Sequence, residues 1–372
     1  MTIAPITIHQ PRRLAVGADT TSQVGAWAAD ATHTLVIATP ITASFVDRLC
    51  LGGKVEIFDA ISGEPDTKIL EMAVDAARRL RPDLIVGLGG GSVLDVAKLV
   101  SVLWDTDQSL EDIAGPNRVG GRRSRLAQVA TTAGTGSEAG IRALITDPGK
   151  GSKISVESAH MIADLAVLDP VLTYSVPTAV TAATGVDAMA HCVEAFTNRR
   201  AHPMIDEFAR MGINLVGRYL ARAVRDGEDT EAREGMMLAS YYGGICLGPV
   251  NTAAGHAIAY PLGTLLDLPH GLANAIIFPH VLAFNQIAVP DKTAEVARAL
   301  NLGNDLSQDE LRSAACAFCS ELGLEMSLAK HGAGEDDLVR YAADAHQIRR
   351  LMDNNPVDMS VDDVLAIYKA AL

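Results

Sequence analysis

Residues 83–98 read DLIVGLGGGSVLDVAK, and this stretch decides the fold. Its first half is a continuous apolar run, which is typical of a parallel strand covered on both faces. Its second half has helical spacing, and three consecutive glycines join the two halves. A strand, a tight turn and a helix in this order predict an α/β domain with a mainly parallel sheet.

The residues of the glycine turn are suited to binding a phosphate group. Glycines let the backbone approach a phosphate closely, and the helix behind them offers free N–H groups and the positive end of its dipole. Ser92 can cap this helix or donate to a phosphate oxygen. A tight turn with a good cap explains the same residues without any ligand. The turn also lacks the GK[ST] ending of a Walker loop, and Ser92 stands in place of the third glycine of the usual dinucleotide fingerprint.

A second turn of this kind lies at residues 131–138, which read TTAGTGSE after another short strand. Glycines interleaved with small hydroxyl residues form a polar surface that a ligand can approach closely. Open α/β sheets bind their ligands in a crevice at the carboxyl ends of the strands. We therefore expect both turns to face one crevice and to hold a dinucleotide.

Strand-like and helical patterns alternate up to about residue 170, and helical patterns dominate beyond it. The chain has 372 residues, more than a single core usually organises. We expect a dinucleotide-binding α/β domain over residues 1–175 and a helical metal-binding domain over residues 176–372. The predicted strands are 34–38, 54–58, 83–88, 127–131 and 165–169, and the predicted helices are 66–80, 178–197, 204–225, 230–247, 306–322 and 360–372.

Charge and hydropathy exclude several function classes. The formal net charge is −14, and the only basic cluster is the short run at residues 122–125. A nucleic-acid partner would need a positive surface, so none is expected. No stretch reaches the roughly 18 apolar residues of a membrane span, so no membrane partner is expected either.

The five cysteines form no disulfide framework in a chain of this length. They suit a reducing compartment, and we expect the protein to be cytoplasmic. Cys316 and Cys319 form a CxxC pair, but no second pair accompanies them. We interpret them as two buried small residues and not as a zinc or redox site.

A different set of residues indicates a metal site. Asp187 and His191 are four residues apart in the helical stretch GVDAMAH, so both side chains lie on one helix face. Their neighbours are small or apolar, which places a carboxylate and an imidazole in the interior. Burial of such groups costs several kcal/mol unless something compensates. A direct hydrogen bond between the two side chains would compensate as well as a metal ion does.

Two further histidines favour the metal. His256 and His270 each lie in a mostly apolar segment with few polar groups to satisfy an imidazole. One carboxylate with three imidazoles suits Fe(II), Zn(II), Co(II) or Mn(II), and the affinity order does not choose among them. His280 is at best a neighbour of this site that does not bind the ion itself.

The motifs at residues 89–98, 132–138, 185–191 and 269–271 together resemble the iron-containing (group III) alcohol dehydrogenases. The match runs in order from about residue 10 to residues 355–356. The resemblance implies a dehydroquinate synthase-like fold, in which an α/β dinucleotide-binding domain precedes an all-α domain and a metal lies in the cleft between them. It also implies a small alcohol or aldehyde substrate and a homodimer.

By the pattern of this family, Asp187, His191, His256 and His270 are the metal ligands. The ion, Fe2+ with Zn2+ as the alternative, polarises the substrate oxygen while a hydride passes to or from NAD(H) or NADP(H). The turn at residues 89–92 holds the pyrophosphate, and threonines of the second turn line the cofactor. The candidate cofactor-binding residues are Gly89, Gly90, Gly91, Ser92, Asp95, Thr131, Thr132, Thr135, Thr39 and Lys153.

The chain departs from the family pattern at two positions. Many members have an aspartate after the first strand that binds the adenosine ribose, and here Pro40 follows Thr39 at that place. Both NAD and NADP therefore remain candidates. Many members also have a histidine four residues after the third ligand, and here it is Tyr260. We expect Tyr260, the cofactor ribose or a water to carry the alcohol proton, which places Tyr260 among the catalytic residues.

Three alternatives remain at this stage. One is a maleylacetate reductase-like enzyme that reduces an acidic oxo compound without metal, and the intact Asp187 and the TAGTGSE turn argue against it. A second is a lyase of the dehydroquinate synthase type, which uses NAD transiently. The third is a non-catalytic binding protein, which fits poorly with four interior residues of ligand type.

Overall fold

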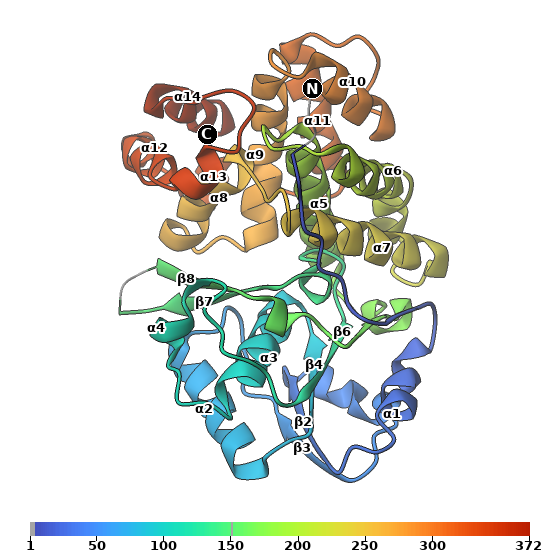
Figure 1. Cartoon of the computed structure of the whole chain (residues 1–372). Helices are drawn as coiled ribbons and strands as arrows, with labels where there is room; N and C mark the ends of the chain where they lie inside the picture. The colour runs from blue at the N-terminus through green and yellow to red at the C-terminus, as the bar shows by residue number, and fades with distance from the viewer. Residues whose placement is uncertain (1–3, 150–151) are drawn as a thin grey trace. The chain divides into compact units, whose positions relative to one another are not determined.

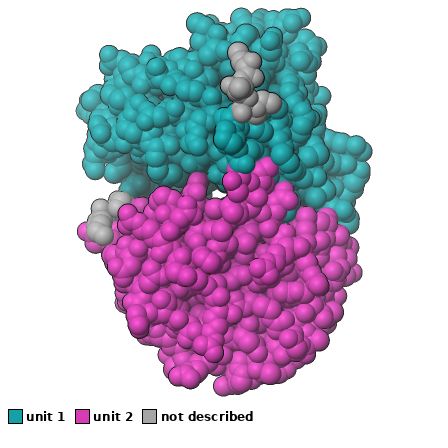
Figure 2. Space-filling model, in the orientation of Figure 1, with its two compact units in different colours: residues 1–6, 176–372 teal, residues 7–175 magenta. Residues whose placement is uncertain are grey.

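The computed structural model describes residues 4–149 and 152–372 (Figure 1). The chain divides into two compact units, which are coloured separately in Figure 2. Residues 7–175 form the first, which we call the α/β unit. Residues 176–372, together with residues 4–6, form the second, which we call the helical unit.

The α/β unit is built on a six-stranded sheet in the order β1-β9-β6-β4-β2-β3, and every pairing between its strands is parallel. The prediction of a mainly parallel sheet is confirmed, and all five predicted strands are present within two residues of their expected ends. The edge strand β1 was not predicted. The strands are β1 Leu14–Val16, β2 His33–Ala38, β3 Lys54–Phe58, β4 Leu84–Gly89, β6 Arg125–Ala130 and β9 Leu165–Leu168.

The central strands are apolar throughout because both faces of the sheet are covered. Leu35 and Ile85 point into a core shared with α2 (Thr67–Leu80) and α3 (Gly91–Leu103). Their neighbours in sequence, Val36 and Val86, point to the opposite core, which includes α1 (Gln23–Trp27). A strand buried on both sides shows a continuous apolar run and no alternation, which is the pattern from which the fold was predicted.

A second, three-stranded sheet has the order β5-β8-β7. Strands β7 (Arg142–Asp147) and β8 (Ser152–Glu157) form an antiparallel pair, and β8 also pairs with the two-residue strand β5 (Gly115–Pro116). The short helix α4 (Leu110–Ile113) precedes β5. None of these four elements was predicted.

The helical unit contains only helices as regular structure among its described residues. The four predicted helices beyond residue 200 and the one over residues 178–197 are all present, which confirms the all-α expectation. The helices are α5 Thr178–Thr197, α6 Pro203–Arg225, α7 Thr230–Leu247, α8 Ala254–Leu265, α9 His270–Asn285, α10 Pro290–Ala299, α11 Gln308–Glu321, α12 Leu338–His346, α13 Arg349–Met352 and α14 Val361–Ala371.

Helix α5 lies at the centre of this unit and packs against α6, α7 and α9. All but one of its residues from Thr181 to its end are buried. A helix buried on every side has to be built from small and apolar residues, so the few charged groups along it need partners inside the protein. Helices α8 and α9 each contain an interior proline, Pro261 and Pro279.

A buried lysine on α3 forms hydrogen bonds with the second glycine turn, residues 131–138, and with the start of β7. Lys98 is fully buried, and its ammonium group donates to Ser137 Oγ and to the carbonyl of Arg142, each at 2.7 Å. Asp95 accepts from Ser137 Oγ at 2.5 Å and from the backbone N–H of Leu144 at 2.8 Å. Burial raises the pKa of the neighbouring Glu138 to about 7, although Lys98 opposes this shift. None of the helices in the described part of the chain has the length and apolar character of a bilayer span.

We predict that Lys98→Met lowers the free energy of unfolding of the α/β unit by about 3–5 kcal/mol, because it removes the buried cation beside Asp95, whose side chain is only 16% exposed. The matched control is Lys54→Met, at an exposed position in β3. Both tryptophans, Trp27 and Trp104, lie in this unit, so urea unfolding followed by tryptophan fluorescence reports on it alone. Equal transition midpoints for the two variants would contradict the prediction.

Candidate metal centre and cofactor turns

Helix α5 supplies two of the four predicted metal ligands and a third charged group. Asp187, His191 and Glu194 follow one another at spacings of four and three residues, which places them on one face of the helix. All three are buried. The structure therefore concentrates the charge of this helix in one interior cluster.

Helices α8 and α9 bring the other two ligands to α5. His256 is in the first turn of α8, and His270 is the first residue of α9. A glycine stands beside each of them. A Cβ on Gly255 would lie 2.5 Å from Glu194 Oε1, and a Cβ on Gly271 would lie 2.5 Å from the carbonyl oxygen of Ala183. Glycine is needed at both positions because any side chain would push the helix start away from α5.

The structure brings all four predicted ligands together around one carboxylate oxygen. Nε2 of His256, His270 and His191 lies 3.5, 3.6 and 3.8 Å from Asp187 Oδ1. The rings of His191 and His256 are stacked with centroids 4.8 Å apart. Donors bound at about 2.1 Å around a tetrahedral ion lie about 3.4 Å from one another. The observed separations are close to that value.

The electrostatics of the cluster favour a cation. Burial alone would raise the pKa of Asp187, but His191, His270 and His256 hold it well below its usual range. Burial also opposes protonation of His256, yet Glu194 and Asp187 outweigh it and raise the pKa of this imidazole to about 10. Two buried carboxylates thus make the interior strongly negative, and a positive charge stabilises it.

Glu194 is a functional residue that the sequence analysis missed. Its Oε1 lies 2.6 Å from His256 Nδ1, and its Oε2 accepts from the backbone N–H of Ala253 at 2.5 Å. A carboxylate on Nδ1 fixes the tautomer in which Nε2 carries no proton and can coordinate a metal ion. The signal was present in the sequence, because residue 194 lies seven positions after Asp187 on the same helix face.

Asn274 is the second residue that was missed. It lies one turn after His270 on α9, and its Nδ2 donates to Asp187 Oδ1 at 2.7 Å. The same Nδ2 is 3.1 Å from His270 Nε2. Asn274 therefore holds the shared carboxylate in position between the helices.

These residues fit a divalent ion. Nε2 of His256 is buried and has no hydrogen-bond partner among the described residues, although it lies beside Asp187. An unpaired nitrogen in such a place is costly unless a ligand occupies its lone pair. One carboxylate and three imidazoles are the donors that first-row divalent metals prefer. Asp187, His256 and His270 also form a group whose ligand atoms all lie within 4.8 Å of one another.

The two glycine turns lie next to each other in the α/β unit. Gly89 at the end of β4 pairs in register with Ala130 at the end of β6, and Thr131 N–H donates to the carbonyl of Gly89 at 3.0 Å. A Cβ on Gly91 would lie 2.6 Å from the Thr135 side chain. Helix α3 begins after Gly90, and no side chain caps it. Its first N–H groups therefore remain available to an anion.

The other candidate cofactor residues differ in position and in hydrogen-bond partners. Thr39, at the end of the neighbouring strand β2, exchanges hydrogen bonds with Thr42. Ser92 is the second residue of α3 and does not cap it. Asp95 is engaged with Ser137 and Leu144, as described above. Lys153 lies on β8, where its ammonium group pairs with Glu64 at 2.8 Å.

Tyr260 lies one turn after His256 on α8. Its ring centroid is 5.7 Å from that of His270, with the planes tilted by 34°. The structure thus places the predicted proton-carrying residue next to a predicted ligand.

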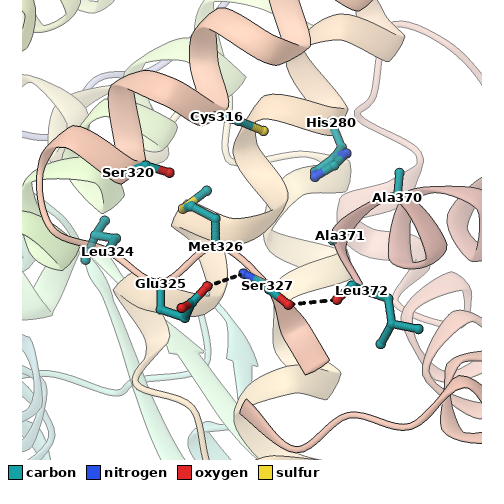
Figure 3. A pocket seen from close by; sticks show the side chains of 10 residues that line it. All are labelled: His280, Cys316, Ser320, Leu324, Glu325, Met326, Ser327, Ala370, Ala371 and Leu372. Carbon is teal, nitrogen blue, oxygen red and sulfur yellow. Dashed lines mark hydrogen bonds between the residues drawn. The ribbon is translucent and has the colours of Figure 1, made fainter. Parts of the chain in front are cut away.

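His280 lies away from the cluster, ten residues and about 15 Å along α9 from His270. It lines a surface hollow of about 520 Å³ together with Cys316, Met326 and the C-terminal end of α14 (Figure 3). Burial and the nearby Arg312 lower the pKa of His280 to about 4. Cys316 and Cys319 are both free thiols. Cys319 is buried but Cys316 is only half-buried, so the prediction of two buried residues is correct for Cys319 alone.

Comparison with known proteins agrees with this geometry. Residues 11–170 match the family described as iron-containing alcohol dehydrogenase, and residues 181–372 match its C-terminal family. Long-chain-alcohol dehydrogenase 1 of Geobacillus thermodenitrificans is 34% identical over 357 residues, which are 92% of this chain and 90% of that protein.

Two further relatives extend the comparison. An NAD-dependent methanol dehydrogenase of Bacillus methanolicus is 34% identical over 86% of this chain and 85% of its own length. The crystal structure of a 1,3-propanediol oxidoreductase has a TM-score of 0.94 at 29% identity and covers 99% of this chain and 100% of that one. The chain therefore belongs to the iron-containing alcohol dehydrogenase family, as the four motifs predicted, and is a nicotinamide-dependent oxidoreductase that interconverts an alcohol and its carbonyl compound.

Proposed function

We propose that Asp187, His191, His256 and His270 hold Fe2+, and that the glycine turns at residues 89–92 and 131–138 hold NAD(H) or NADP(H). The observation that carries this proposal is the convergence of three imidazole nitrogens within 3.8 Å of one Asp187 oxygen. The same donor set would accept Zn2+. In this proposal, residues 1–175 form the dinucleotide-binding domain and residues 176–372 form the metal-binding domain.

When bound, Fe2+ supplies Lewis-acid polarisation of the substrate oxygen, and the nicotinamide supplies or accepts the hydride. The protein's own residues prepare the site. Glu194 fixes the orientation of the His256 ring, and Asn274 fixes the Asp187 carboxylate. Tyr260 gives a proton to the carbonyl oxygen during reduction and takes it back during alcohol oxidation, directly or through a water.

The nicotinamide preference, the assembly and the location are also part of the proposal. The relative described as an NAD-dependent methanol dehydrogenase favours NAD as the cofactor. Pro40 offers no carboxylate to repel a 2′-phosphate, so NADP is the second cofactor to test. We propose a homodimer, as the family resemblance implies. A cytoplasmic location is supported by five cysteines that are all free thiols.

The proposal is tested with protein reconstituted with Fe2+ and, separately, with Zn2+. We expect short aldehydes to be reduced with net oxidation of NADH or NADPH, followed at 340 nm. His256→Ala should lose most of the bound metal and its turnover, because both Asp187 and Glu194 then lack their partner. His160→Ala, at an exposed position, is the control and should retain both. Full activity of metal-free protein, or full metal retention by His256→Ala, would refute the assignment.

Glu194 provides a second test that depends on metal binding alone. We predict that Glu194→Ala weakens the affinity for the metal by about 10- to 100-fold, and that Glu194→Gln, which keeps an acceptor for His256, weakens it less. The measurement is a titration against a chromophoric chelator, and Glu321→Gln, at an exposed position on α11, is the control. Unchanged affinity in Glu194→Ala would show that this carboxylate does not position His256.

Tyr260 is tested through the pH dependence of alcohol oxidation. Loss of a general acid–base group typically lowers the rate by about 10²-fold or more. We predict such a fall in kcat for Tyr260→Phe, with one ionisation missing from its pH–rate profile and metal content unchanged. An unaltered profile would remove Tyr260 from the proton path and leave the cofactor ribose or a water.

A further inference from the structure

Arg350 lies near the predicted metal ligand His270 and is separated from it by the ring of Tyr260. It lies on α13, is exposed, and its guanidinium carbon is 5.8 Å from the centroid of the Tyr260 ring. The Tyr260 ring in turn contacts His270. A continuous path of contacts thus leads from a proposed ligand, across one aromatic ring, to a cation.

Among the four predicted ligands, His270 has the most exposed side chain. The side chain of His270 is 32% exposed, whereas that of His256 is only 3% exposed. A substrate that approaches the ligands past His270 therefore meets the ring of Tyr260, which Arg350 covers.

Arg350 is also free to bind an anion. It forms no ion pair with a carboxylate in residues 4–149 or 152–372, although the net charge of the chain is −14. Its neighbour Arg349 pairs with Asp353 and contacts His346. Asp344, the other carboxylate close in sequence, faces Arg340 at 3.7 Å. The carboxylates near Arg350 are therefore directed to other partners.

The contact between Arg350 and Tyr260 indicates which kind of substrate group would bind there. A guanidinium group over an aromatic ring keeps its N–H groups available along its edge for a two-pronged contact with an oxyanion. We infer that Arg350 binds the carboxylate of the substrate, so that the preferred substrates are aldehydes or alcohols with a carboxylate at the far end of the carbon chain. This inference rests on the proposed function, because it assigns a substrate class to the same site.

The test compares oxo acids with neutral aldehydes of equal length. Metal-loaded wild type, Arg350→Ala and the matched control Arg349→Ala are assayed with 4-oxobutanoate and butanal, and with 6-oxohexanoate and hexanal. We expect wild type and Arg349→Ala to favour an oxo acid over its neutral partner. Arg350→Ala should raise the KM of that acid by about 10- to 100-fold, as expected for loss of a charge-assisted contact, and change kcat and the neutral aldehydes less than about threefold.

A binding measurement keeps the subsite separate from the reaction. Butanedioate and hexanedioate are titrated calorimetrically into the same three proteins. We expect wild type and Arg349→Ala to bind one of them and Arg350→Ala to lose this binding. If no aldehyde is reduced by any protein, the proposed function fails, and the titration still decides the anion subsite.

Two results would overturn the inference. One is equal discrimination between acid and neutral substrates by wild type and Arg350→Ala, without diacid binding that depends on Arg350. The other is a rise in the KM of NADPH or NADH in Arg350→Ala with the oxo acids unaffected, which would assign the guanidinium to a cofactor phosphate.

Discussion

One carboxylate oxygen, Oδ1 of Asp187, imposes the arrangement of the helical unit. It lies in the interior and faces three imidazoles from three different helices, and burial of such charges costs several kcal/mol unless they are compensated. Helices α5, α8 and α9 therefore have to meet at this atom. The small residues around it, above all Gly255 and Gly271, are what this close meeting requires. The packing of α5, α8 and α9 is therefore set by the need to bring their buried charged groups together.

Much of the fold could be predicted because its pattern is local. The central strands of the α/β unit are apolar on both faces, and the long helices repeat at helical spacing, so both signals are visible in the chain itself. The missed elements lack such a signal. Strand β1 has three residues. Strands β7 and β8 form a local antiparallel pair, but their sequences, RALITD and SKISVE, lack the continuous apolar run of the central strands. Helices α8 and α9 contain Pro261 and Pro279, residues that normally argue against a helix interior.

The candidate site was partly visible for the same reason. Asp187 and His191 share a helix face at a recognisable spacing, and His256 and His270 stand out as polar residues in apolar segments. Glu194 was missed although its spacing was readable, because a single glutamate in a helix usually faces solvent. Arg350 could not be found from the sequence, since nothing local relates it to a tyrosine ninety positions earlier. The contact between them exists only in the folded chain.

The position of His270 at the very start of α9 has a consequence for how durably an ion is held. No side chain caps this helix end, and terminal turns open far more readily than helix interiors. Asp187 and His191 lie in the interior of α5, and both are buried. His256 is in the first turn of α8, but Glu194 holds both its ring and the backbone N–H of Ala253. Among the four proposed ligands we therefore expect His270 to release an ion first, so that the fraying of a single helical turn would control how readily the proposed centre exchanges one metal for another.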